Sequence, residues 1–180
     1  MHLFSSPSIR IATADDASSI TKLLNIAYRG EASKQGWTTE AHLIAGDTRT
    51  DEKTIQEIMQ QPGSTFLICR DEEQQLIGCI NLQQHGTKLY LGMFSVSPQL
   101  QGTGIGKQLL QAAEEHAATM KATAIYMTVI TLRTELVNWY QRHGYADTGE
   151  RKAFTEDGLT GKHLQPLEFM VLEKPFSQFS

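Results

Sequence analysis

A glycine-rich segment, residues 101–107, is the part of the sequence best suited to bind a ligand. It follows an extended apolar run, 93–98, that ends in Pro98, and it opens a stretch with helical periodicity. The first amide groups of a helix have no partner inside the helix, and the helix dipole adds partial positive charge at the same end. Glycines let a ligand approach these amides closely. The segment therefore predicts a site for a diphosphate group.

Two well-known phosphate-binding loops do not fit this segment. A Walker A loop that ends at Gly106 and Lys107 would require glycine at position 101, where the chain has Gln101. A dinucleotide-binding fingerprint that begins at Gly102 would require glycine at position 107. The segment instead fits the pattern Gln-x-x-Gly-x-Gly, preceded by a strand that ends in Val-x-Pro.

This pattern resembles the acyl-CoA binding motif of the GNAT superfamily of acyl-CoA-dependent N-acyltransferases. A second element, 139–145, resembles the Tyr-x-x-x-Gly-Phe/Tyr element of the same superfamily, with Tyr140 as its tyrosine. The resemblance implies transfer of an acyl group from a CoA thioester, most simply acetyl-CoA, to the primary amine of a small molecule or peptide. The sequence from Arg133 to Tyr140 looks like that of an uncharacterised bacterial subgroup, which implies no particular amine.

The resemblance also implies which residues bind CoA. Backbone groups of Phe94, Ser95 and Val96 would contact the pantetheine arm, and a backbone N–H there would stabilise the tetrahedral oxyanion. The pyrophosphate would lie on N–H groups of the glycine-rich segment, with Lys107 adding positive charge. That segment comprises Gln101, Gly102, Thr103, Gly104, Ile105, Gly106 and Lys107.

Tyr140 is the candidate catalytic residue, as the general acid that protonates the departing thiolate. An unperturbed phenol has a pKa near 10, so it is protonated at neutral pH and is about as basic as an alkyl thiolate. The alternative is an aromatic residue that only packs on the sheet. The superfamily often has asparagine where this chain has Arg133, which is either a further CoA contact or a surface residue paired with Glu135.

The acceptor pocket is less well defined by the sequence. Relatives that acetylate histone-like lysines have a glutamate where this chain has Tyr90, so a carboxylate base on that strand is not expected. Tyr28, Glu31, Trp37 and Glu40 are candidate substrate-binding residues, because they lie in or beside a segment without clear periodicity and such loops commonly carry specificity. Glu31 or Glu40 is a candidate base, with a chain of water molecules as the alternative. A solvated loop position also fits each glutamate, and Trp37 also fits a small core beneath the loop.

The order of expected elements predicts an α+β fold. Strands are indicated at 8–12, 65–70, 76–82, 88–96 and 123–130 and in a closing pair after residue 145, and helices after residue 16 and at 50–60, 104–120 and 134–142. This order, β-α-α-β-β-β-α-β-α-β-β, is that of a GNAT-like mixed, mostly antiparallel sheet flanked by helices. The face of the third helix expected to be buried comprises Ile105, Leu109, Ala112, His116 and Met120.

Composition narrows the class of protein further. The chain has 180 residues, 40% hydrophobic and 20% charged, which predicts one domain over 1–180. A net charge of -4 argues against a nucleic-acid partner. The N-terminal residues do not resemble a leader and no apolar stretch reaches the roughly 18 residues of a membrane span, so we expect a cytoplasmic protein without a membrane partner. Cys69 and Cys79 are expected to be reduced core thiols, and we expect no metal site.

Two classes of function remain open from the sequence. The first is an acetyl-CoA-dependent N-acetyltransferase, a monomer or homodimer. The second is an acyl-CoA binding module with little turnover, whose occupancy regulates a partner. Tyr140 favours the enzyme, whereas the missing asparagine at Arg133 and the missing glutamate at Tyr90 favour the binding module. Thiol release from acetyl-CoA in the presence of amines discriminates between them.

Overall fold

A mixed β-sheet lies at the centre of the computed structural model, which describes residues 4–28, 50–153 and 168–176. Within these residues the sheet has seven strands in the order β1-β2-β3-β4-β5-β7-β6. The strands are β1 (Ile9–Ile11), β2 (Ser64–Arg70), β3 (Leu76–His85), β4 (Lys88–Val96), β5 (Ala124–Ile130), β6 (Ala146–Ala153) and β7 (Glu168–Pro175). Only β4 and β5 pair in parallel, while every other neighbouring pair is antiparallel. The α+β prediction is confirmed.

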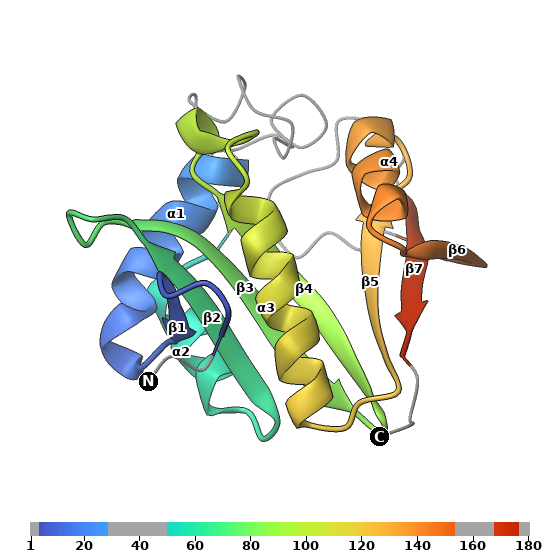
Figure 1. Cartoon of the computed structure of the whole chain (residues 1–180), viewed down its shortest axis with the longest axis horizontal. Helices are drawn as coiled ribbons and strands as arrows, with labels where there is room; N and C mark the ends of the chain where they lie inside the picture. The colour runs from blue at the N-terminus through green and yellow to red at the C-terminus, as the bar shows by residue number, and fades with distance from the viewer. Residues whose placement is uncertain (1–3, 29–49, 154–167, 177–180) are drawn as a thin grey trace.

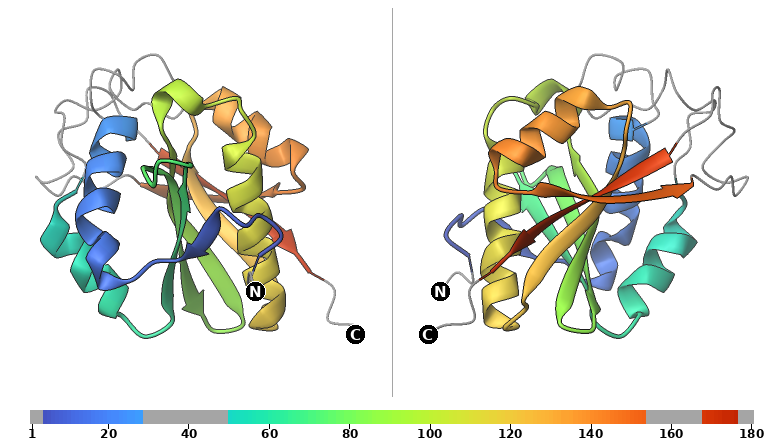
Figure 2. Two further views of the ribbon diagram at one scale, coloured as in Figure 1. Left: turned by 60° about the vertical axis from the view of Figure 1, so that its left-hand side comes forward. Right: turned by 90° about the vertical axis from the view of Figure 1, so that its right-hand side faces the viewer.

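Helices cover both faces of the sheet (Figure 1, Figure 2). They are α1 (Ala17–Tyr28), α2 (Glu52–Gln60), α3 (Ile105–Thr119) and α4 (Thr134–Arg142), with short 3-10 turns η1 (Ala14–Asp16) and η3 (Pro98–Leu100). Helices α1 and α2 pack on one face and α3 and α4 on the other. In the described part of the chain, none of the helices has the length and apolar character that a membrane span needs.

The sheet separates two hydrophobic cores. The core under α3 and α4 includes Leu89, Leu91 and Leu109, and the core under α1 and α2 includes Ile20, Leu24 and Ile55, all nearly inaccessible to solvent. Cys69 and Cys79 lie on the neighbouring strands β2 and β3, where they are buried and form no disulfide, as predicted. Because packed helices cover both faces, the central strands are held in position from both sides.

The buried side of α3 differs in part from the predicted one. Leu109 and Ala112 are buried as expected, but Met120 lies just past the helix end and is 37% exposed, and His116 is only half-buried. The remaining buried residues of the helix are Leu110, Ala113 and Ala117. Alanine is small and only weakly apolar, so it contributes little to a hydrophobic pattern even where it packs closely on a sheet. The buried face that was predicted from the larger residues therefore differs from the observed face, which includes Ala113 and Ala117.

A buried carboxylate joins the first strands to the start of α1. Asp16 is 3% exposed, and its two oxygens accept hydrogen bonds at 3.0 Å from both terminal nitrogens of Arg10. Arg70 donates to the same carboxylate at 2.7 Å and the N–H of Thr13 at 2.8 Å. Burial raises the pKa of Asp16, but these hydrogen bonds from Arg10, Thr13 and Arg70 outweigh it and leave that pKa well below its ordinary value.

Asp16 is therefore expected to stabilise the fold in a pH-dependent manner. Asp16→Asn should lower the free energy of unfolding by roughly 2–4 kcal/mol at neutral pH, because it leaves two guanidinium groups without their anion. A carboxyl with a depressed pKa in the folded state stabilises fully above about pH 5 and loses that contribution as the pH falls through 4 and below. Urea unfolding of the wild type and of Asp16→Asn should show that the difference between their free energies of unfolding becomes smaller from pH 7 to pH 3. A difference that stays constant over this range would contradict the role of Asp16.

Candidate active site

Strands β4 and β5 separate where the candidate site lies. They pair only over 88–90 and 124–126, and beyond these residues they diverge (Figure 1). Next to the divergence β4 contains a bulge, because Met93 and Phe94 together face the single residue Ile80 of β3. Met93 has a left-handed φ of +48°, which is rare outside glycine. The bulge places Phe94, Ser95 and Val96 at the opening between the two strands.

The glycine-rich segment connects the end of β4 to α3. Gln101 donates a side-chain hydrogen bond to the carbonyl of Val96 at 3.2 Å, which ties the segment to the strand. Gly102 and Gly104 have φ values of +87° and +94°, a region where a side chain is strained. Gly104 is also the N-cap of α3 and has no side chain with which to cap it. The first amides of α3 are therefore left to a ligand or to solvent.

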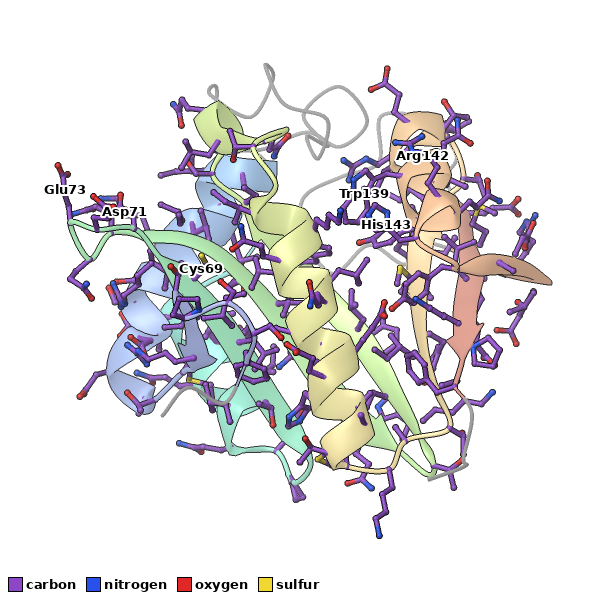
Figure 3. The ribbon with its side chains drawn as sticks, viewed as in Figure 1. Cys69, Asp71, Glu73, Trp139, Arg142 and His143 are labelled. Carbon is purple, nitrogen blue, oxygen red and sulfur yellow. The ribbon has the colours of Figure 1, made fainter. Side chains whose placement is uncertain are left out.

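Helix α4 presents one face to this opening. Leu136, Trp139, Tyr140 and His143 follow the spacing i, i+3, i+4, i+7, which places them on one side of a helix. The ring centroids of Trp139 and Tyr140 lie 5.9 Å and 6.2 Å from that of Phe94. Trp139 and His143 are labelled on the side of α4 that faces α3 in Figure 3. The two helices and β4 thus enclose a common space.

That space is a cavity of about 370 Å³. Most of the residues that line it were named from the sequence, namely Phe94, Ser95, Val96, Gln101, Gly102, Gly104, Gly106, Lys107 and Tyr140. Residues from the strand, the glycine-rich segment and the tyrosine element are far apart in the sequence, yet the fold brings them together. Their roles in binding and catalysis stay predictions.

Three residues proposed to bind CoA do not line the cavity. The hydroxyl of Thr103 donates to the carbonyl of Leu100, and Ile105 packs against the core under α3. Arg133 is the N-cap of α4 and is only 8% exposed, so the alternative of a surface arginine is wrong. The side chains of Thr103 and Ile105 thus serve the local structure before α3 and its packing, while their backbone amides remain part of the glycine-rich segment.

Four lining residues were not proposed as site residues: Leu136, Trp139, Arg142 and His143. At the end of α4, the Nδ1–H of His143 donates to the carbonyl of Trp139 at 2.8 Å. Leu136 and His143 lie four residues before and three residues after Tyr140. This helical spacing could have indicated from the sequence that they share a face with Tyr140. Among the acceptor residues, Tyr28 ends α1, while its side chain and all of Glu31, Trp37 and Glu40 lie outside the described residues.

The chemistry of the cavity fits an acyl-CoA molecule. Phe94, Val96 and Trp139 offer apolar surface to a pantetheine arm, and the uncapped start of α3 beside Lys107 suits its phosphates. Over the described ranges, no group of three or more His, Cys, Asp or Glu side chains is placed to hold a metal ion.

Solved structures with the same fold include two N-acetyltransferases. The ribosomal-protein-S18-alanine N-acetyltransferase of Escherichia coli superposes with a TM-score of 0.70 at 12% identity, over 96% of this chain and 95% of that one. A ribosomal-protein-alanine N-acetyltransferase of Brucella melitensis gives a TM-score of 0.71 at 17% identity, over 93% and 99% of the two chains. At these identities the likeness shows the fold class alone.

Sequence comparison adds the family. The family model described as acetyltransferase (GNAT) domain matches residues 33–164, which is most of the chain. The chain belongs to the GNAT family of acetyltransferases. Its similarity to the spermine/spermidine N(1)-acetyltransferase of Bacillus subtilis is 31% identity over 64 residues, which cover 35% of this chain and only 42% of that relative.

Gly104 provides a test of the glycine-rich segment. Gly104→Ala should lower the affinity for CoA by roughly tenfold or more, because a side chain at φ +94° strains the backbone and displaces the amides at the start of α3. The matched control is Gly149→Ala in β6, where φ is +87° and, as at Gly104, a Cβ would meet no atom within 4 Å. Both variants should lose roughly 1 kcal/mol of stability. Calorimetric titration with CoA should then separate them, and equal affinities would refute the proposed role of the segment.

Proposed function

We propose that the protein transfers an acetyl group from acetyl-CoA to a primary amine of a small molecule or peptide. The observation that carries this proposal is a single cavity with the start of α3 at one wall and Tyr140 at the other. A module that only binds acyl-CoA needs the start of α3 but not Tyr140. A buried phenol at the opposite wall is what an acyl transfer requires in addition, since the departing thiolate must gain a proton.

The residues along the cavity suit the successive parts of acetyl-CoA. The amides of 104–107 and the ammonium group of Lys107 bind the pyrophosphate. Backbone groups of 94–96 bind the pantetheine arm as a strand would, and an N–H there stabilises the oxyanion. The thioester that the cosubstrate supplies is the electrophile of the reaction.

Tyr140 acts in the second half of the transfer. The amine nitrogen forms a bond to the thioester carbon, the carbon–sulfur bond breaks, and Tyr140 donates its proton to the sulfur. The amine nitrogen loses one proton in the same reaction, to Glu31, Glu40 or a chain of water molecules. Tyr140 is 4% exposed, so bulk water does not compete for its contacts within the cavity.

The relatives suggest which amines to examine first. Spermine and spermidine are named for the Bacillus subtilis relative, and an alanine of ribosomal protein S18 is named for the Escherichia coli structure. The net charge of -4 is compatible with a cationic substrate. We therefore include both polyamines and alanine-initiated peptides in the acceptor class.

Release of free thiol from acetyl-CoA tests the activity directly. The protein is incubated with acetyl-CoA and, in turn, with spermidine, spermine, an alanine-initiated peptide and a set of simple primary amines. At least one amine should accelerate thiol release well above hydrolysis. Tight CoA binding without acceleration by any amine would instead support the acyl-CoA binding module.

Tyr140→Phe should separate chemistry from binding. Loss of the general acid should lower kcat by roughly 10²- to 10⁴-fold while the affinity for CoA changes little, because the ring remains to pack against Phe94. Tyr126→Phe is the control, since the Tyr126 hydroxyl bonds His85 Nδ1 and Tyr126 does not line the cavity. Steady-state kinetics with the best amine should show the loss in the first variant alone. Unchanged turnover would remove Tyr140 from the mechanism.

A further inference from the structure

The cavity between α3 and α4 has basic side chains along its walls. Lys107, Arg142 and His143 line it, and none of the described residues that line it is aspartate or glutamate. The whole chain, in contrast, has 20 acidic residues and a net charge of -4. A cleft lined by charges of one sign concentrates their field on a ligand of the opposite sign. The cavity therefore favours an anion, although the protein as a whole is acidic.

Arg142 has no partner among the described residues. Its side chain makes no hydrogen bond and no ion pair there, and the residue is exposed. Three other arginines, Arg10, Arg70 and Arg151, each pair with a carboxylate, and Arg133 is buried. The guanidinium group of Arg142 is therefore available to an anion that enters the cavity.

Trp139 relates the position of Arg142 to the start of α3. A Cβ built on Gly106 would lie 3.7 Å from a ring carbon of Trp139, so the indole reaches the first turn of α3. Arg142 follows Trp139 by about one turn of α4, and Figure 3 labels both residues there beside His143. The ring centroids of His143 and Trp139 lie 4.3 Å apart, which holds the two rings together. Arg142 and Lys107 thus reach the same cavity from two helices, close to the contact between them.

CoA and its esters carry one phosphate beyond the pyrophosphate, at the 3′ position of the ribose. This phosphate is a monoester, with a charge of roughly -1.5 to -2 at neutral pH. The amides of 104–107 and Lys107 suit the pyrophosphate, and they lie on the wall opposite to Arg142. The planar guanidinium group of an arginine forms two parallel hydrogen bonds with a phosphate, so Arg142 suits the remaining dianion.

We propose that the guanidinium group of Arg142 binds the 3′-phosphate of CoA and acetyl-CoA. This inference rests on the proposed function and adds to it a residue that distinguishes these molecules from dephospho-CoA, which lacks the 3′-phosphate. Arg142 lies in the last turn of α4, where a cation also interacts favourably with the helix dipole. That interaction involves no ligand, so it gives no preference between CoA and dephospho-CoA.

Calorimetric titration with CoA and with dephospho-CoA tests the role of Arg142. The wild type should bind CoA roughly fivefold to thirtyfold more tightly than dephospho-CoA, as one charge-assisted pair at an exposed site allows. Arg142→Gln should lower the affinity for CoA to that for dephospho-CoA and leave the affinity for dephospho-CoA unchanged. The matched control is Lys22→Gln, which removes the same charge from an exposed position of α1, on the other face of the sheet. This control should bind both ligands as the wild type does.

Phosphorus NMR of bound CoA reads the contact itself. A nearby cation favours the dianion, so the second pKa of the 3′-phosphate should be lower in the complex with the wild type than in the complex with Arg142→Gln. The pyrophosphate resonances should be the same in both complexes. A merely structural role of Arg142 in α4 would leave the titration of the 3′-phosphate unchanged.

The outcomes separate this inference from the proposed function. If the wild type binds CoA and dephospho-CoA equally well, or if Arg142→Gln weakens both by the same factor, the inference is wrong and the proposed function stands. The same holds if Arg142→Gln keeps the full preference for CoA, which would assign the 3′-phosphate to another residue. If the wild type binds neither ligand, the proposed function is wrong and the inference falls with it.

Discussion

The separation of β4 from β5 is the constraint on which the rest of the site depends. In a parallel pair both strands end at the same edge of the sheet, and here each strand leads into a helix at that edge, β4 into α3 and β5 into α4. If the ladder continued beyond residue 90, the strands would close the space that these helices enclose. Because it stops there, the start of α3 and the side of α4 face one another across an opening rather than a packed strand.

The bulge at Met93 sets the direction of every side chain beyond it. Leu89 and Leu91 face α3, so strict alternation would also direct Met93 to that side. The extra residue reverses the alternation: Met93 packs under α1 and α2, and Phe94 turns to the cavity. A left-handed methionine costs of order 1–3 kcal/mol, which packing on both faces of the sheet must outweigh. The strained residue thus lies directly before Phe94, which lines the cavity.

The sequence predicted the parts of the site that depend on local rules. The glycine-rich segment predicted a loop that opens a helix with unpaired first amides, and the structure has Gly104 as an N-cap without a side-chain cap. The positive φ of Gly102 and Gly104 is a finding of the structure. The element around Tyr140 lies beside them, as the family order implies. The bulge could not be predicted, because it depends on how β4 pairs with Ile80 of β3 rather than on a residue that requires it. Likewise, nothing local to Arg133 indicated burial, which follows from packing between distant elements.

Tyr140 packs against Tyr145, and Tyr145 is hydrogen-bonded to α3, the helix that forms the opposite wall of the cavity. Its ring packs edge-on against Tyr145 with centroids 6.1 Å apart. Tyr145 is buried and donates its hydroxyl to Glu114 of α3 at 3.0 Å, and Lys174 of β7 pairs with the same carboxylate at 3.0 Å. Burial, and next the charge of Glu114, raise the pKa of Tyr145, so it remains a donor at any physiological pH. Since α3 also begins with the glycine-rich segment, one helix connects the glycine-rich end of the cavity to the residues that support Tyr140. The distance between the two walls of the cavity is therefore set by packing within the protein.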